Sequence, residues 1–370
     1  MNISRSMKRT RTICTFNSME QLSSILEGLN LKKGVILLDR QINHVDVSRQ
    51  NSPVRHIDVS LPGKAIIDSL KMIKDDETCD SFVVIGDQNL INYAKLTAME
   101  TGISLIVIPS SFIACNSSND IVSFVEDDRL HQIRHESMIP RATVIDESIT
   151  GLPGVKNKSI EIYALSGALI DAIAVCEIGS YQYDLCLEGF RLCIRAGTAA
   201  AHSQHDHDSR QQIATASHLL SLAKGDLSST ILDTAATALS HIGQIPYSTA
   251  AMILFPYILE VLISRQPDIF ASFYSFFNEG TFSPSSCSAW LLKFTNTLVS
   301  PIAKQIPYSL YDLDDRDFEK KISIPSLERI AKITAESRCV CSYSTLFTKQ
   351  EIIDLMERAY WGYQGRQEAP

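Results

Sequence analysis

The chain has 370 residues, of which 45% are hydrophobic and 21% are charged, a mix typical of a soluble globular protein with room for two domains. Its formal net charge of −8 argues against a surface that binds nucleic acid or an anionic membrane. The basic N-terminus has no apolar run behind it, so we expect a lightly ordered tail, with a mitochondrial presequence as the less favoured alternative.

Short β-rich runs alternate with helical patterns in the first part of the chain. The runs are ICTF (13–16), VILLD (35–39), RHIDV (55–59), SFVVIG (81–86) and SLIVIP (104–109), and the helical patterns lie at 19–29, 63–73 and 89–101. Continuous apolar strands that alternate with amphipathic helices indicate a parallel sheet covered on both faces. IVSFVED (121–127) is predicted to be a hairpin strand and RATVIDE (141–147) to be a final strand of the same layer.

From about residue 152 the pattern becomes helical, and GLPG at 151–154 is a natural hinge. We therefore predict a doubly wound α/β domain over residues 1–152, an all-α domain over 153–370, and a cleft between them. Ligands of such sheets bind beyond the carboxyl ends of the strands, which places the loops after Asp39, Gly86 and Pro109 at the mouth of the cleft.

Two apolar segments of the second part stand out. STAAMILFPYILEVLIS (248–264) is interrupted by Pro256 and Glu260 and falls short of the about 20 apolar residues of a membrane span, so we predict a buried helix. ALSGALIDAIAVCEI (164–178) is predicted to form one helix with a single carboxylate, Asp171, in its middle. A buried carboxylate requires a partner, a metal or a catalytic role.

The nine cysteines are scattered, and we expect free thiols in a reducing cytoplasm. A histidine-rich stretch, AHSQHDHDSR (201–210), contains His202, His205 and His207 at a spacing that suits zinc or nickel. A solvated linker with Asp208 as a helix N-cap is the favoured interpretation of this stretch.

Six stretches, in this order and at this spacing, resemble the iron-containing alcohol dehydrogenase family, which shares its fold with dehydroquinate synthase and glycerol dehydrogenase. They are VVIGDQNLINYAKLTA, SLIVIPSSF, RATVIDESITGLP, IDAIAV, IPYSTAAMILFPYILE and TLFTKQEIIDLMERAY, and they span almost the whole chain. The resemblance implies NAD(P) in the cleft, a divalent metal held by one Asp and three His, and hydride transfer to or from a carbonyl.

The resemblance also assigns the cofactor contacts to particular positions, at which this chain departs from the family. The residues implied to contact NAD(P) are Asp39, Gly86, Asp87, Gln88, Asn89, Lys95, Ser110 and Ser111. The family's Gly-Gly-Gly-Ser turn keeps only its first glycine, and Asp87 is expected to repel a pyrophosphate. Asp39 suits an adenosine ribose, with a strand-end turn residue as the equal alternative.

At the metal positions, only Asp171 is retained. The family's histidine one helical turn later is Val175, and the other two ligands fall at Thr237 and Tyr247. We therefore expect no tightly bound divalent metal. His241 matches a family histidine that lines the active site without binding metal, and a helix-surface histidine is the alternative.

The favoured function is a metal-independent, NAD(P)-linked oxidoreductase of a small carbonyl or alcohol, similar to the maleylacetate reductase branch. Tyr247 would donate a proton, with His241 as relay and Asp171 beside them. The alternative is a catalytically inactive or repurposed protein of the same fold. A dehydroquinate synthase-like cyclase ranks third, because residues 161–178 lack the lysine it needs. We expect a small-molecule substrate and, from the resemblance, a homodimer.

Overall fold

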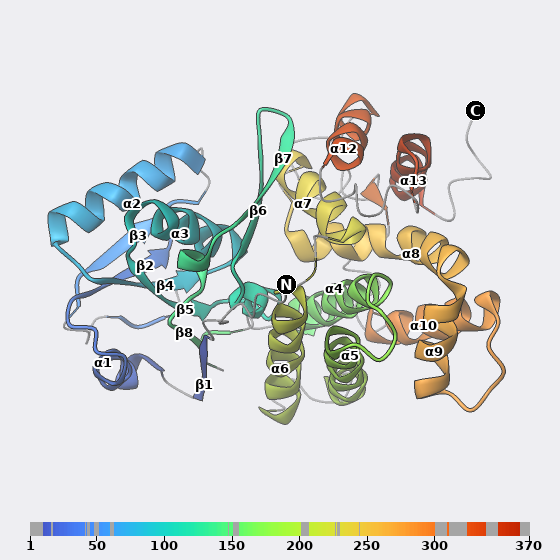
Figure 1. Ribbon diagram of the computed structural model, residues 1–370, viewed down its shortest axis with the longest axis horizontal. Coiled ribbons are helices and arrows are strands. Elements are labelled where there is room, and N and C mark those ends of the chain that lie inside the picture. The colour runs from blue at the N-terminus through green and yellow to red at the C-terminus, as the bar shows by residue number, and fades with distance from the viewer. Residues whose placement is uncertain are drawn as a thin grey trace, which may run out of the picture. The chain divides into compact units, whose positions relative to one another are not determined.

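The computed structural model describes residues 10–15, 18–40, 42, 45–47, 52–59, 63–146, 148–150, 155–200, 207–225, 227, 230–243, 245–299, 309–310, 324–337 and 347–362. The chain forms two compact units (Figure 1). The first comprises Met1–Val122 and Ile133–Leu152, and the second Ser123–Gln132 and Pro153–Pro370. The hinge expected at 151–154 and the side chains of His202, His205 and His207 lie outside the described residues.

The first unit contains a six-stranded parallel sheet in the order β1-β8-β5-β4-β2-β3. Its strands are β1 (Arg11–Thr15), β2 (Gly34–Asp39), β3 (Val54–Ile57), β4 (Ser81–Gly86), β5 (Ser104–Pro109) and β8 (Ala142–Asp146). Its helices are α1 (Ser18–Gly28), α2 (Gly63–Glu77) and α3 (Gln88–Thr101), with 3-10 turns η1 (Ile113–Ser117) and η2 (Glu136–Met138). The predicted parallel sheet is therefore confirmed.

The central strands are apolar throughout because both faces of the sheet are covered. Every residue of β2, β4 and β8 is buried. Leu37 and Val84 point into a core shared with α2 and α3, whereas Ile36 and Val83 point into a core shared with α1. This alternation places α2 and α3 on one face and α1 on the other, as Figure 1 shows.

The predicted hairpin strand is β6 (Ile121–Glu126), and it pairs with β7 (Arg129–Arg134) in a separate two-stranded sheet. The sequence analysis did not identify β7, because RLHQIR carries too many polar side chains for a buried-strand pattern. The tip of this hairpin belongs to the second unit, where the Arg329 guanidinium Nε donates to Asp128 Oδ1 at 2.7 Å.

The described part of the second unit is helical. Its helices are α4 (Val155–Ile173), α5 (Tyr181–Ala200), α6 (His207–Lys224), α7 (Ile231–Gly243), α8 (Tyr247–Arg265), α9 (Pro267–Phe277), α10 (Pro284–Val299), α12 (Ile324–Glu336) and α13 (Lys349–Trp361). Among the described helices, α8 alone is long and apolar enough to cross a membrane. Twelve of its nineteen residues are buried in the protein, which supports the predicted core helix.

One predicted helix is shorter than expected. ALSGALIDAIAVCEI was predicted to be helical throughout, but α4 ends at Ile173, so Asp171 lies in its last turn. The chain then tightens, with Val175 N donating to Ala172 O at 3.2 Å, and turns at Gly179, which has a φ of +76°. Val175 therefore lies beyond the helix rather than one turn along its face.

Candidate functional site

Asp171 is the fully buried carboxylate that the sequence predicts. Its Oδ2 accepts a hydrogen bond from the backbone N–H of Leu232, at the start of α7, over 2.7 Å. Burial raises the pKa of Asp171 to about 7, against the lowering effects of its hydrogen bonds and of the Lys224 charge. Asp171 therefore joins α4 to α7 and carries a proton more readily than an ordinary aspartate.

A second polar cluster lies in the same helices. The Lys224 ammonium, at the end of α6, forms an ion pair with Asp233 Oδ1 over 3.1 Å. The Tyr247 hydroxyl, at the start of α8, donates to the same oxygen over 2.9 Å. In this Lys224–Asp233–Tyr247 cluster, Lys224 is buried, while Asp233 and Tyr247 are partly exposed. Asp171 interacts electrostatically with all three members.

Tyr247 stays protonated at neutral pH in this setting. Burial and the adjacent Asp233 carboxylate raise the pKa of Tyr247 well above its usual value. The hydroxyl donates to Asp233 Oδ1 rather than to Asp171, the carboxylate that the sequence analysis places beside it.

His241 lies in the last turn of α7. Partial desolvation and the positive charge of Arg329 lower the pKa of His241, so the imidazole is neutral at pH 7. Its resolved electrostatic neighbour is thus Arg329, on α12, and the predicted proton relay to Tyr247 stays a prediction.

The residues at the metal positions do not fit a divalent ion. Val175 has no donor atom, Thr237 offers a hydroxyl, and Tyr247 is a protonated phenol already bonded to Asp233. Within the described ranges, no group of three or more His, Cys, Asp or Glu residues is arranged to hold a metal. The positive charge beside Tyr247 and Asp233 is instead the Lys224 ammonium of the chain itself.

Four of the eight predicted cofactor residues lie at the carboxyl edge of the sheet: Asp39, Gly86, Ser110 and Ser111. Gly86 pairs with Pro109 across β4 and β5, and Ser110 N donates to Gly86 O over 2.8 Å. The pairing of Leu38 with Ile85 places Asp39, which is buried, beside Gly86. Ser111 accepts a hydrogen bond from Ala114 N over 3.3 Å and thereby starts the η1 turn.

The glycine turn does not fit a pyrophosphate bound to the α3 N-terminus. Asp87 is the N-cap of α3, and its Oδ1 accepts from Asn89 N at 2.9 Å and from Leu90 N at 3.2 Å. These backbone N–H groups are the donors that a phosphate would need. Packing alone explains the glycine at position 86, since a Cβ there would lie 2.8 Å from Leu90 Cδ2.

Lys95 is completely buried and engaged within the first unit. Its ammonium donates to Asn119 O at 2.8 Å, to Asn119 Oδ1 at 3.2 Å and to Ile121 O at 3.3 Å. Burial lowers the pKa of Lys95 to about 7. Gln88 is also engaged, because its amide donates to Asn92 Oδ1 and accepts from Ser117 Oγ. Both side chains thus stabilise the fold around the turn.

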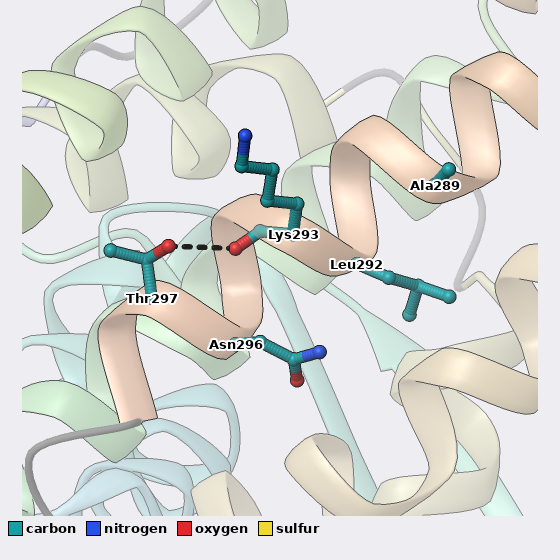
Figure 2. A pocket seen from close by; sticks show the side chains of 5 residues that line it. All are labelled: Ala289, Leu292, Lys293, Asn296 and Thr297. Atoms are coloured by element: carbon teal, nitrogen blue, oxygen red, sulfur yellow. Dashed lines mark hydrogen bonds between the residues drawn. The ribbon is translucent and has the colours of Figure 1, made fainter.

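Two other features of the second unit carry no site. Asp208 lies inside the first turn of α6, which begins at His207, so it is not the predicted N-cap. Its negative charge still interacts favourably with the helix dipole. A hollow of about 470 Å³ runs along α10. Figure 2 shows that its five lining side chains all project from that one helix: Ala289, Leu292, Lys293, Asn296 and Thr297.

Lys224 and Asp233 were missed by the sequence analysis. Asp233 carries the same signal as Asp171, a lone carboxylate in an apolar helix, ILDTAATAL. Lys224 follows the apolar run LLSLA at the end of α6. Their pairing joins two helices and becomes visible only in three dimensions.

No protein-family model and no curated protein matches the chain. Several solved structures match it over nearly its whole length. An iron-containing alcohol dehydrogenase from Corynebacterium glutamicum is 16% identical, with a TM-score of 0.78, covering 100% of this chain and 99% of its own. A maleylacetate reductase from Agrobacterium tumefaciens is 19% identical, with a TM-score of 0.75 and coverage of 97% and 99%.

The NADH-dependent butanol dehydrogenase A from Thermotoga maritima is 10% identical, with a TM-score of 0.78 and coverage of 97% and 99%. Likenesses at these identities establish a fold and not an activity. The proteins that share it are alcohol dehydrogenase-like oxidoreductases. The chain therefore has the two-part fold of the iron-containing alcohol dehydrogenases, as its sequence motifs predict.

Proposed function

We propose that this chain is a metal-independent, non-redox protein of the dehydrogenase fold, which binds a small carbonyl or alcohol compound. The observation that carries the proposal is the Lys224–Asp233–Tyr247 cluster, in which an ion pair and a phenol share one carboxylate oxygen. In this proposal the protein is cytoplasmic, and the cluster takes the place of the family's metal.

The chemistry of the cluster suits a ligand that has a hydroxyl or a carbonyl oxygen. Tyr247 donates its one O–H proton to Asp233, so its oxygen can accept a hydrogen bond from a ligand hydroxyl. The Lys224 ammonium pairs with the same carboxylate and has further N–H donors for a ligand carbonyl oxygen. Asp233 holds the phenol in position throughout.

A second candidate is the NAD(P)-linked reduction or oxidation of the same class of compound. The shared fold favours it, as does the grouping of Asp39, Ser110 and Ser111 at the carboxyl edge of the sheet. The Asp87 cap opposes it, because the N–H groups for a phosphate are already bonded. We therefore rank the non-redox function first.

The test is a calorimetric titration of short-chain aldehydes, ketones and alcohols against the wild-type protein and Tyr247→Phe. Loss of one hydrogen bond to the ligand is expected to weaken binding about tenfold. Tyr183→Phe is the matched control, because Tyr183 is a buried tyrosine of the same unit that lies outside the Lys224–Asp233–Tyr247 cluster.

Equal affinity in the wild type and Tyr247→Phe would rule out the cluster as the binding site. The same compounds are then mixed with NADH or NADPH, and the absorbance of the reduced cofactor is followed. Turnover of the cofactor by the wild type would establish the second candidate instead.

A further inference from the structure

The N-terminus of α3 is closed by the chain's own carboxylate. A helix begins with four backbone N–H groups that lack partners within the helix, and these form the usual phosphate site of such folds. Here Asp87 Oδ1 accepts from the N–H groups of Asn89 and Leu90, and Asp87 O accepts from Ile91 N at 3.2 Å. The bond from Ile91 N is the first one within the helix, so the Asp87 carboxylate caps two of the four open groups, Asn89 N and Leu90 N.

The geometry of Asp87 is that of a well-formed cap. Its backbone is extended, with φ −79° and ψ −176°, as an N-cap residue requires. The neighbouring polar side chains do not compete for it, because Gln88 bonds to Asn92 and Ser117, and Lys95 bonds to the backbone at Asn119 and Ile121. The cap is thus part of a closed set of hydrogen bonds.

We propose that the Asp87 carboxylate occupies the place of a ligand phosphate at α3, so that the wild-type protein excludes dinucleotides from this turn and substitution of Asp87 by glycine opens it. Two effects act in the same direction. The carboxylate takes up the donors that a phosphate would use, and its negative charge repels a second anion within a few ångströms.

The experiment is a calorimetric titration of ADP and of NADH into the wild type, Asp87→Gly and Asp87→Asn. Glycine is tolerated at an N-cap, so Asp87→Gly is expected to fold. We expect no binding at millimolar cofactor by the wild type and a gain of at least about tenfold in affinity for Asp87→Gly. Asp87→Asn keeps a capping oxygen without the charge and is expected to stay closed.

Asp80→Gly is the matched control. Asp80 also accepts two backbone N–H groups in the first unit, from Lys32 at 2.8 Å and Lys33 at 3.2 Å, but it does not lie at α3. Its removal costs similar hydrogen bonds and is expected to leave cofactor binding unchanged. Circular dichroism of all variants verifies that α3 and the sheet are folded.

Binding of NADH by the wild type as tightly as by Asp87→Gly would overturn the proposal. So would an Asp87→Gly protein that is folded and still binds neither ADP nor NADH, or an Asp87→Asn protein that binds like the glycine variant. These readouts involve the first unit alone, so they are distinguishable from a failure of the function proposed for Tyr247.

Discussion

At the scale of single residues, the chain shows how one carboxylate is tolerated in an apolar helix. Asp171 is fully buried, yet it retains one strong hydrogen bond from Leu232 N and lies within reach of the Lys224 charge. These interactions do not offset desolvation, so the neutral form is favoured up to about pH 7. The protonation state of Asp171 should therefore be visible in the stability of the protein.

We predict that the wild type loses stability relative to Asp171→Asn as the pH rises from about 4 to 7. In this window the folded state holds the Asp171 proton and the unfolded state has lost it, so raising the pH favours unfolding. The contribution of Asp171 to the free energy of unfolding changes by at most about 4 kcal/mol over this range, because its pKa rises from 3.8 to about 7 on folding.

The measurement is urea denaturation at several pH values, followed by tryptophan fluorescence. Both tryptophans, Trp290 and Trp361, belong to the second unit, as does Asp171. Lys95 titrates with a lowered pKa of about 7 and therefore affects stability above this window. Identical pH profiles for the wild type and Asp171→Asn would show that Asp171 is ionised in the folded state at all these pH values.

At the scale of elements, the helix ends reveal how local sequence sets local structure. α13 begins with a capping box, in which Thr348 Oγ1 accepts from Glu351 N at 3.2 Å and Glu351 Oε2 accepts from Thr348 N at 2.7 Å. Farther along, Arg358 forms an ion pair with Glu260 and lies over the Tyr257 ring, both on α8. The cap and the contact with α8 together fix the position of α13.

We predict that Thr348→Ala lowers the free energy of unfolding by about 0.5–2 kcal/mol, because Glu351 N loses its acceptor and the Glu351 carboxylate loses the Thr348 hydroxyl. Thr297→Ala is the matched control. The Thr297 hydroxyl donates to Lys293 O at 2.8 Å on the exposed face of α10 (Figure 2), which contributes little to a helix. Chemical denaturation of both variants gives the comparison, and equal losses would contradict the assigned capping role.

The elements also separate what the sequence predicts from what it leaves open. The apolar strands β2, β4 and β5 were predicted within a residue, because burial on both faces leaves an unbroken apolar run. β7 was missed because its side chains are mostly polar, and the end of α4 was missed because Val175 and Cys176 continue the apolar pattern past it. Hydrophobic pattern thus fixes which segments are buried but not where a helix stops.

The candidate site was predicted less completely than the fold, for a related reason. Asp171, Tyr247 and Gly86 were found because motif positions point to them. Asp87 was identified as a charge that repels phosphate, whereas its hydrogen bonds show a cap that fills the phosphate's place. The pairing of Lys224 with Asp233 joins separate helices and leaves no signal at short spacing.

At the scale of the whole molecule, the chain keeps a fold over its full length at low sequence identity. The likeness to solved structures covers 96–100% of this chain, yet identity stays at 10–19%. A packed sheet and helical core tolerate such change as long as volume and pattern are kept, whereas a metal site tolerates no loss of ligands. The metal content of the intact protein is therefore a direct test of whether the chain shares more than the fold with the metal-dependent enzymes.

We predict that the purified protein contains no stoichiometric iron, zinc or nickel, and that a chelator leaves its melting temperature unchanged. The reason is the donor set, in which Asp171 is accompanied by Val175, Thr237 and a bonded Tyr247. Metal analysis by mass spectrometry and thermal melts with and without EDTA provide the measurement. The histidine-rich stretch supplies the control, as a variant with His202, His205 and His207 all changed to alanine. Metal that is absent from the triple-alanine variant is bound by the histidine-rich stretch. Metal that stays in the triple-alanine variant but is absent from Asp171→Asn would contradict the prediction, because it would be bound between α4, α7 and α8.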